Sequence, residues 1–141
     1  MLLQMIYSSE AAPDLVLADF EKMLAEFRVR NQARGITGML LLVEGVFVQI
    51  LEGESDRVLT LMRSLERDGR HRDMKVFYRS FVEERSFASW SMAYLSPSAE
   101  EVARWAELGG ATTIQDVVAS LESDPKRVES FIVNLLHSIA D

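Results

Sequence analysis

The chain has 141 residues, 48% of them hydrophobic and 26% charged, so it can bury a core and falls in the size range of one domain. Its formal charge of −7 argues against nucleic acid or an anionic membrane as a partner, because both require a basic face. The sequence contains no cysteine, which excludes disulfides, thiolate metal sites and cysteine nucleophiles. It shows neither a basic signal region nor an apolar run of the ~18–20 residues that span a bilayer, so we expect a cytoplasmic protein.

The first predicted element is a strand over residues 2–8. Alternation puts Leu3, Met5 and Tyr7 on one face, so a phenol shares its side of the strand with apolar neighbours. A buried hydroxyl must find a hydrogen-bond partner, because leaving it unsatisfied costs on the order of 1–3 kcal/mol. We therefore expect Tyr7 to meet another buried polar side chain or a polar ligand.

A helix is expected next, opening at Pro13 and Asp14 and ending between Asn31 and Gly35. Its apolar residues recur at spacings of three and four, which gives one stripe for packing on a sheet. The members of this stripe are Leu17, Phe20, Leu24 and Phe27. Asn31 lies beyond the stripe and is the second polar residue that we expect to point inward.

Two strands are predicted over residues 36–43 and 46–51, joined by a hairpin turn at residues 44–45. The first strand is nearly continuous in apolar residues, so both of its faces are expected to be covered. Its two faces are Ile36, Leu40 and Leu42 on one side and Met39, Leu41 and Val43 on the other. The second strand places Phe47, Gln49 and Leu51 together, and Gln49 is the polar member of that face.

The strand is expected to break at residues 53–55, and a second amphipathic helix follows that ends near residues 68–69. The apolar residues of this helix are Val58, Leu61, Met62 and Leu65. Two more strands are predicted over residues 74–82 and about 90–95, with residues 83–89 as their connection. The order βαββαββ predicts an α+β fold, a ferredoxin-like sheet with two helices on one face.

Beyond Pro97 the pattern predicts helices only, the last of them from Pro125 to Ile139. The apolar stripe of that last helix is wide, so this tail must cover the other sheet face, a partner subunit, or both. We therefore divide the chain into a domain over residues 1–96 and a C-terminal helical extension over residues 97–141. A homodimer is the expected assembly.

The common enzyme signatures are missing from this sequence. His71 and His137 lack metal-ligand spacing, and there is no GxGxxG, Walker or GxSxG motif. An acylphosphatase would need an anion-binding loop directly after the first strand, where this chain places Glu10. We therefore expect neither a metal site nor an enzyme.

A spaced set of segments over residues 1 to about 96 resembles the BLUF family of blue-light sensors that use FAD. The segments are Tyr7 in the first strand, Asn31, Ile36-Thr37-Gly38, Phe47 to Gly53 with Gln49, Asp68-Gly69-Arg70-His71, and Phe87 to Met92 with Trp90-Ser91-Met92. Many members carry a second polar side chain beside the asparagine, and here Arg30 and Gln32 flank it. The fold that the resemblance implies agrees with the predicted element order.

The resemblance also implies a flavin, FAD or possibly FMN, held between the two helices on one sheet face. Asn31 would hold the pyrimidine edge of the ring, Arg70 and His71 would contact its pyrimidine end, and Asp68 would orient that pair. Apolar walls are a general need of such clefts. On this basis the expected walls are Met23, Leu24, Leu40, Phe47 and Leu65.

The resemblance also implies a photochemical role for two residues: Tyr7 would donate an electron and then a proton, and Gln49 would be the switch. Rotation or tautomerisation of the Gln49 amide would change the hydrogen bonds that the flavin receives. Trp90 and Met92 are the implied relay, and either could lie next to Gln49, because a one-residue slip exchanges the faces of a strand. The signal would pass to an unknown effector protein.

Two other classes of function stay open from the sequence alone. The same sheet could hold a different ligand, as a non-photochemical binding or interaction module with the helical tail as its interface. A small enzyme is the third possibility, although the chain offers no evident reactive group for turnover. A yellow purified protein with a flavin absorption band would favour the photoreceptor over the other two.

Overall fold

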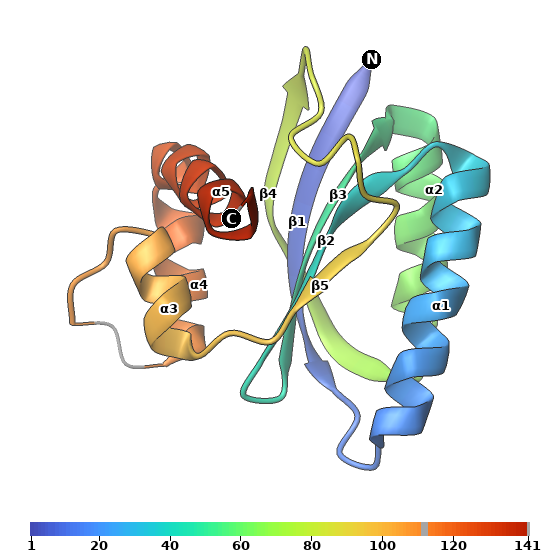
Figure 1. Ribbon diagram of the computed structural model, residues 1–141, viewed down its shortest axis with the longest axis horizontal. Helices are drawn as coiled ribbons and strands as arrows, with labels where there is room; N and C mark the ends of the chain where they lie inside the picture. Colours follow the sequence, from blue (N-terminus) through green and yellow to red (C-terminus); the bar gives the residue numbers. More distant parts are fainter. Residues whose placement is uncertain (111–112, 141) are drawn as a thin grey trace.

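In a computed structural model, the described residues 1–110 and 113–140 form one five-stranded sheet with helices on both faces (Figure 1). The elements are β1 (Leu2–Ala11), α1 (Leu17–Arg34), β2 (Thr37–Val43), β3 (Val46–Glu54), α2 (Ser55–Glu66), β4 (His71–Val82), β5 (Ala93–Leu95), α3 (Ala99–Trp105), α4 (Ile114–Ser123) and α5 (Pro125–Ala140). The predicted α+β, ferredoxin-like fold is confirmed. Within the described residues, no helix is long and apolar enough to cross a membrane.

The strands lie in the order β4-β1-β3-β2-β5, antiparallel except for the parallel pair β2–β5. β4 and β5 occupy opposite edges, so the chain between them crosses the width of the sheet. We call this segment, residues 83–92, the connector. The last strand was predicted to begin near Trp90, but it begins at Ala93, and Trp90 and Met92 belong to the connector. Only three residues pair with β2, too few to show a strand pattern in sequence.

The first helix begins later than the sequence predicts. Pro13 and Asp14 form a turn in which the Leu15 N–H donates to the Ala12 carbonyl oxygen at 3.0 Å, and α1 begins at Leu17. Leu17 was expected on the packed stripe but is 72% exposed. The buried residues of α1 are Phe20, Met23, Leu24, Phe27 and Asn31. Gly35, at φ 65°, ends the helix in the left-handed conformation that glycine adopts readily.

The expected break at residues 53–55 is wrong, because β3 continues to Glu54 and α2 begins at the next residue. Gly53 lies inside the strand, where a Cβ would come within 3.2 Å of the Gly35 carbonyl oxygen. The glycine thus permits close approach of β3 to the end of α1. The second helix also ends earlier than expected, at Glu66, and β4 begins at His71.

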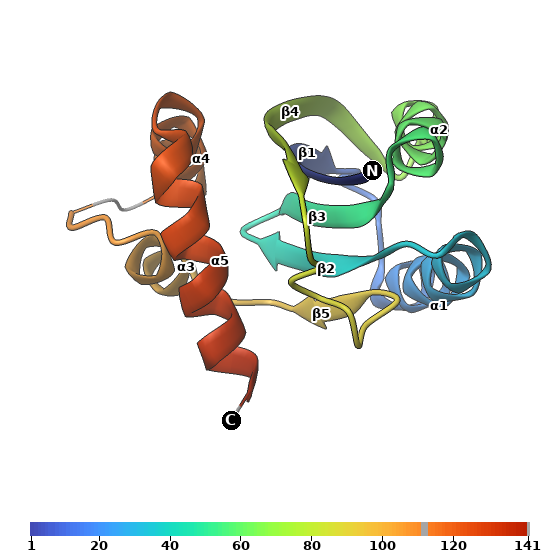
Figure 2. The same ribbon diagram turned by 90° about the horizontal axis from the view of Figure 1, so that it is seen from above.

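Each face of the sheet has its own buried cluster. α1 and α2 cover one face, where Leu3, Met5 and Tyr7 lie together as the alternation predicts. α3, α4 and α5 cover the other face, as Figure 2 shows from above, so the helical tail does pack on the sheet. The tail contributes Val102, Val117, Phe131 and Leu135, among others, to this second cluster.

Candidate functional site

Tyr7 and Gln49 are direct cross-strand partners at the centre of the sheet, on the face that α1 and α2 cover. The Tyr7 hydroxyl donates a hydrogen bond to Gln49 Oε1, and the two residues are 2% and 1% exposed. Burial raises the pKa of Tyr7 well above its ordinary value, and Asp68 adds to this effect while Arg30 opposes it. The phenol is therefore neutral and keeps its proton for donation.

Of the two candidate relay residues, Met92 is the one that lies next to Gln49. Its sulfur accepts a hydrogen bond from Gln49 Nε2 at 3.5 Å, so the two ends of the amide face Tyr7 and Met92. Trp90 instead packs with the cluster on the other face, and its ring lies 6.2 Å from that of Phe87. The two candidate relay residues thus belong to opposite faces of the sheet.

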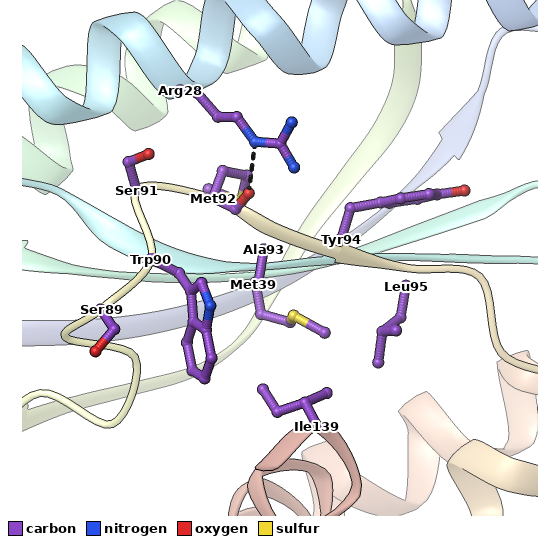
Figure 3. A pocket seen from close by; sticks show the side chains of 10 residues that line it. All are labelled: Arg28, Met39, Ser89, Trp90, Ser91, Met92, Ala93, Tyr94, Leu95 and Ile139. Atoms are coloured by element: carbon purple, nitrogen blue, oxygen red, sulfur yellow. Dashed lines mark hydrogen bonds between the residues drawn. The ribbon is translucent and has the colours of Figure 1, made fainter. Parts of the chain in front are cut away.

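A groove of about 400 Å³ lies at the β5 edge, between the connector and the end of α5 (Figure 3). Trp90 and Ile139 face each other across it. The Arg28 Nε donates to the Met92 carbonyl oxygen at 3.0 Å, the contact drawn as a dashed line. The backbone of the residue that touches Gln49 is therefore tied to α1 at this groove.

Asn31 is buried in the last turns of α1 and faces the same part of the connector. Its Nδ2 donates to the Ser91 carbonyl oxygen at 2.9 Å, while its Oδ1 is buried without a hydrogen-bond partner among the described residues. A buried acceptor left unsatisfied costs on the order of 1–3 kcal/mol. The amide is thus held at one end and has an unused acceptor at the other.

Arg30 lies one position before Asn31 and adds a second unsatisfied group. Its Nε is buried without a partner in the described part of the chain, and its guanidinium lies 4.9 Å from the centre of the Phe27 ring. Burial lowers the pKa of Arg30, and the neighbouring Arg34 lowers it further. The last turns of α1 thus carry one buried donor atom, Arg30 Nε, and one buried acceptor atom, Asn31 Oδ1, that have no partner among the described residues.

Arg70 and Asp68 form a bidentate ion pair after α2. Arg70 Nε and Nη2 donate to the two carboxylate oxygens at 2.9 and 2.7 Å, and Arg70 Nη1 reaches Glu26 Oε2 on α1 at 3.0 Å. Burial raises the pKa of Asp68, but the hydrogen bonds from Arg70 outweigh it and hold that pKa below its ordinary value. The pair with Asp68 in turn raises the pKa of Arg70. This ion pair links the end of α2 to α1.

His71 begins β4, with its ring centre 6.0 Å from that of Tyr7. Its Nε2 lies 2.6 Å from the Leu65 carbonyl oxygen and its Nδ1 lies 2.7 Å from Ser9 Oγ. Because a carbonyl oxygen can only accept, Nε2 carries the proton in the neutral ring and Nδ1 accepts from the hydroxyl. The imidazole is thus fixed in orientation beside Tyr7.

The expected apolar walls all share one buried cluster with Tyr7 and Met92. They are Met23, Leu24, Leu40, Phe47 and Leu65. Together with Asn31, Gln49 and His71, they line the layer between the sheet and the two helices. The structure thus brings Tyr7, Gln49, His71 and Met92 into contact with one another, whereas Trp90 packs on the other face.

Several residues with a place in the site were missed by the sequence prediction. Phe27 was assigned to the helix stripe only, yet both Arg30 and Arg70 have guanidinium groups over its ring, at 4.9 and 5.7 Å. Ser9 and Arg28 were also missed. A serine on a strand or an arginine on an exposed helix face carries no pattern that distinguishes it from ordinary surface.

The buried polar atoms without partners can be compared with the hydrogen-bonding groups of a flavin ring. The pyrimidine edge of a flavin offers an N–H and two carbonyl oxygens. Asn31 Oδ1 can accept from the N–H, and Arg30 Nε can donate to a carbonyl oxygen. The donor and acceptor set of the described residues therefore fits the group that the sequence resemblance implies.

Comparison with known proteins agrees. Residues 2–93 match the family model described as sensors of blue light using FAD. The photoactivated adenylate cyclase subunit beta of Euglena longa is 30% identical over 132 residues, which is 93% of this chain but 14% of that protein. The subunit alpha of Euglena gracilis is 30% identical over 93% of this chain and 12% of its own length. The chain thus spans about one seventh of these relatives or less.

Two solved structures are similar over nearly the whole chain. One is the photo-activated state of BlsA, with a TM-score of 0.81 and 27% identity over 96% of this chain and 95% of that chain. The other is the dark state of BlrB, a BLUF protein, with a TM-score of 0.76 and 28% identity over 97% and 96%. The chain therefore belongs to the BLUF family, the sensors of blue light using FAD.

Proposed function

We propose that this chain is a blue-light photoreceptor that binds FAD non-covalently between α1 and α2 and signals through the connector. The observation that carries the proposal is the buried Gln49 amide, which accepts from the Tyr7 hydroxyl at one end and donates to the Met92 sulfur at the other. The Gln49 side chain thus connects the Tyr7 phenol with the connector. It can therefore turn a local change into a displacement.

The proposed cofactor contacts follow from the unsatisfied and orienting groups. Asn31 would hold the pyrimidine edge through its free Oδ1, with Arg30 on a ring carbonyl oxygen. Asp68 would orient Arg70, and Ser9 and the Leu65 carbonyl would orient His71, at the same end of the site. The apolar walls would be Met23, Leu24, Leu40, Phe47 and Leu65.

Bound FAD would supply absorption of blue light and an acceptor for one electron. Tyr7, a neutral phenol, would donate an electron to the flavin and then its proton. The Tyr7 O–H already points at Gln49 Oε1, so the proton has an acceptor in place. Gln49 would then rotate or tautomerise, which exchanges donor for acceptor at both ends of the amide. The electron and the proton would afterwards return to Tyr7, so that the rearranged amide would be the lasting change.

The rotated amide would present Oε1 to the Met92 sulfur, which cannot donate to it. Met92 would then move, and the connector would carry the change past Trp90 to the groove at Ile139 on α5. Residues 1–96 would be the sensing domain and residues 97–141 the signalling extension, of which residues 111–112 and 141 lie outside the described residues. The effector would be a partner protein, and sensing without turnover is the role proposed for this chain.

A homodimer through the extension is part of the proposal. Val133 on α5 is 49% exposed, although the same helix buries Phe131 and Leu135 completely against the sheet. The proposed contact would use this exposed part of α5. Light scattering during size-exclusion chromatography would measure the assembly, and a monomer in both dark and light would contradict the dimer.

The decisive experiment is a light-minus-dark absorption spectrum of the purified protein. Wild type should be yellow, release FAD rather than FMN on denaturation, and show a reversible red shift of the flavin band under blue light. Tyr7→Phe should still bind flavin but lose the red shift, because the variant removes the donor hydroxyl and nothing else. Gln49→Leu should lose it as well.

Tyr78→Phe is the matched control, because Tyr78 packs against the cluster on the opposite sheet face. It should retain the full red shift. A normal photocycle in Tyr7→Phe would refute the proposed photochemistry. A colourless wild-type protein that is stable without cofactor would instead support a binding or interaction module.

A further inference from the structure

Glu52 is a fully buried carboxylate that the proposed photochemistry does not use. It lies on β3 with 0% exposure, facing the side of the sheet that the helical tail covers. Its Oε2 accepts from Gln4 Nε2 at 2.9 Å and from the Ser86 N–H at 2.7 Å. Its Oε1 accepts from Thr37 Oγ1 at 3.1 Å and from the Phe87 N–H at 2.8 Å.

All four contacts are donors, which suits an ionised carboxylate, since that group can only accept. Arg85 lies close by but uses its Nη1 on Thr37 Oγ1 at 2.9 Å and on the Glu52 backbone carbonyl oxygen at 3.2 Å. Burying a charge is costly unless hydrogen bonds replace its hydration. Two of the bonds that hold this charge come from backbone N–H groups of the connector.

The same pair of strands therefore carries two polar cross-strand pairs three residues apart. Tyr7 and Gln49 form one pair, and Gln4 and Glu52 form the other. Because side chains alternate along a strand, an odd separation puts the two pairs on opposite faces. Each pair contacts the connector, Gln49 through Met92 near its end and Glu52 through residues 86–87 near its start.

We propose that Glu52 is a positioning residue that anchors the start of the connector and so holds Met92 against Gln49. This inference rests on the proposed function for its role in signalling. The anchor fixes residues 86–87 to the central strand, so that movement of Met92 is confined to the end of the connector. Without the anchor, the start of the connector would be free to shift, and the position of Met92 against Gln49 would depend on the hydrogen bonds to the carbonyls of residues 90–92 alone.

The test compares Glu52→Gln with Gln4→Met. The glutamine variant keeps the shape but can accept at one end only, so at least one of the Ser86 and Phe87 N–H groups would face an NH₂ group. The methionine variant removes the hydrogen bond of Gln4 to the same carboxylate and its long contact with Ser86 Oγ, and it leaves both backbone contacts of Glu52 in place. Two measurements apply to both variants: amide hydrogen exchange by NMR in the dark, and the rate of dark recovery after blue light.

In Glu52→Gln we expect exchange of the Ser86 and Phe87 amides to accelerate roughly 10- to 100-fold, the range for loss of a hydrogen bond to a charged group. The red shift should still form, because Tyr7 and Gln49 face the other side, but dark recovery should change by roughly threefold or more. Gln4→Met should leave both amides protected and recover at the wild-type rate.

Equal loss of thermal stability in both variants, with unchanged exchange at Ser86 and Phe87 and unchanged recovery, would overturn the anchor. If Glu52→Gln does not fold, the same exchange measurement is made on the wild-type protein. Exchange of the Ser86 and Phe87 amides as fast as that of the exposed Ala88 amide would overturn the proposed anchor, and slower exchange would support it. The absence of a red shift in the wild-type protein would refute the photoreceptor proposal but not the anchoring role of Glu52. The exchange measured in the dark would still decide whether Glu52 holds the connector.

Discussion

The contact between Gln49 and Met92 makes a prediction that separates the two relay candidates. Met92→Leu conserves side-chain volume in a position that is 2% exposed, so the cost in folding stability should stay below about 1.5 kcal/mol. The substitution removes the sulfur, which is the acceptor for Gln49 Nε2 at 3.5 Å. Trp90→Phe changes a ring that packs on the opposite face.

The magnitude follows from the weakness of this hydrogen bond. A neutral hydrogen bond contributes about 0.5–1.5 kcal/mol, and an acceptor sulfur belongs at the lower end of that range. Losing it destabilises the dark orientation of the Gln49 amide, which leaves its NH₂ group without an acceptor. The dark recovery should therefore slow by roughly two- to fivefold, since about 1.4 kcal/mol corresponds to a factor of ten.

The assay is the decay of the red-shifted flavin band in the dark at fixed temperature. We expect Met92→Leu to form the full red shift and recover slowly, and Trp90→Phe to recover at the wild-type rate. Thermal unfolding of both variants controls for general loss of packing. Slow recovery in Trp90→Phe together with wild-type recovery in Met92→Leu would refute the assignment of Met92 as the neighbour of Gln49.

Two further predictions concern the binding end of the site. Asn31→Leu removes the unused acceptor Oδ1 and the hydrogen bond to the Ser91 carbonyl, so the affinity for flavin should fall roughly 10-fold or more. An unchanged affinity in a fluorescence titration would contradict the proposed contact. Asp68 has a pKa lower in the folded than in the unfolded protein, so its stabilising contribution is complete above pH about 4 and is lost as pH falls through the folded value. The gap in melting temperature between wild type and Asp68→Asn should therefore narrow below pH about 4, and a constant gap down to pH 2 would refute this origin.

Alternation along the strands predicted the central pair well. Because the side-chain period of a strand is two, Tyr7 had to share a face with Leu3 and Met5, and Gln49 had to share one with Phe47. The structure confirms both faces. That the two residues are direct partners could not be predicted, because their pairing depends on the register between β1 and β3, which no local turn joins.

The connector is where the sequence was least informative. The path of the connector is fixed by contacts with residues that are distant in sequence. The carboxylate of Glu52, for example, accepts from the N–H groups of Ser86 and Phe87, which follow it by 34 and 35 positions. In sequence, Glu52 is one acidic residue in a strand, with a solvent-exposed position as its ordinary interpretation. Trp90 and Met92 were ambiguous for the same reason, because only a paired strand fixes which side chains share a face.

The strengths of the contacts along the connector indicate which one yields when the switch changes. Three hydrogen bonds of 2.9–3.1 Å hold the backbone carbonyls at the end of the connector. The Gly38 N–H donates to the Trp90 carbonyl, the Asn31 side chain to the Ser91 carbonyl, and the Arg28 side chain to the Met92 carbonyl. The contact with the switch is a single bond to a thioether at 3.5 Å. In the proposed mechanism, a rearranged Gln49 would therefore displace the Met92 side chain at low cost, while the backbone would stay attached to α1 and β2.

That asymmetry also explains why the response can reach α5 without unfolding the edge of the sheet. β5 pairs with β2 through only three residues, and the groove beside it is lined by Trp90 and Ile139. A short strand next to a side chain that moves cheaply can shift as a unit, because few ladder bonds oppose it. In the proposed mechanism, the element that changes state would be the Met92 side chain together with β5, and the groove at α5 would be the surface on which a partner senses the change.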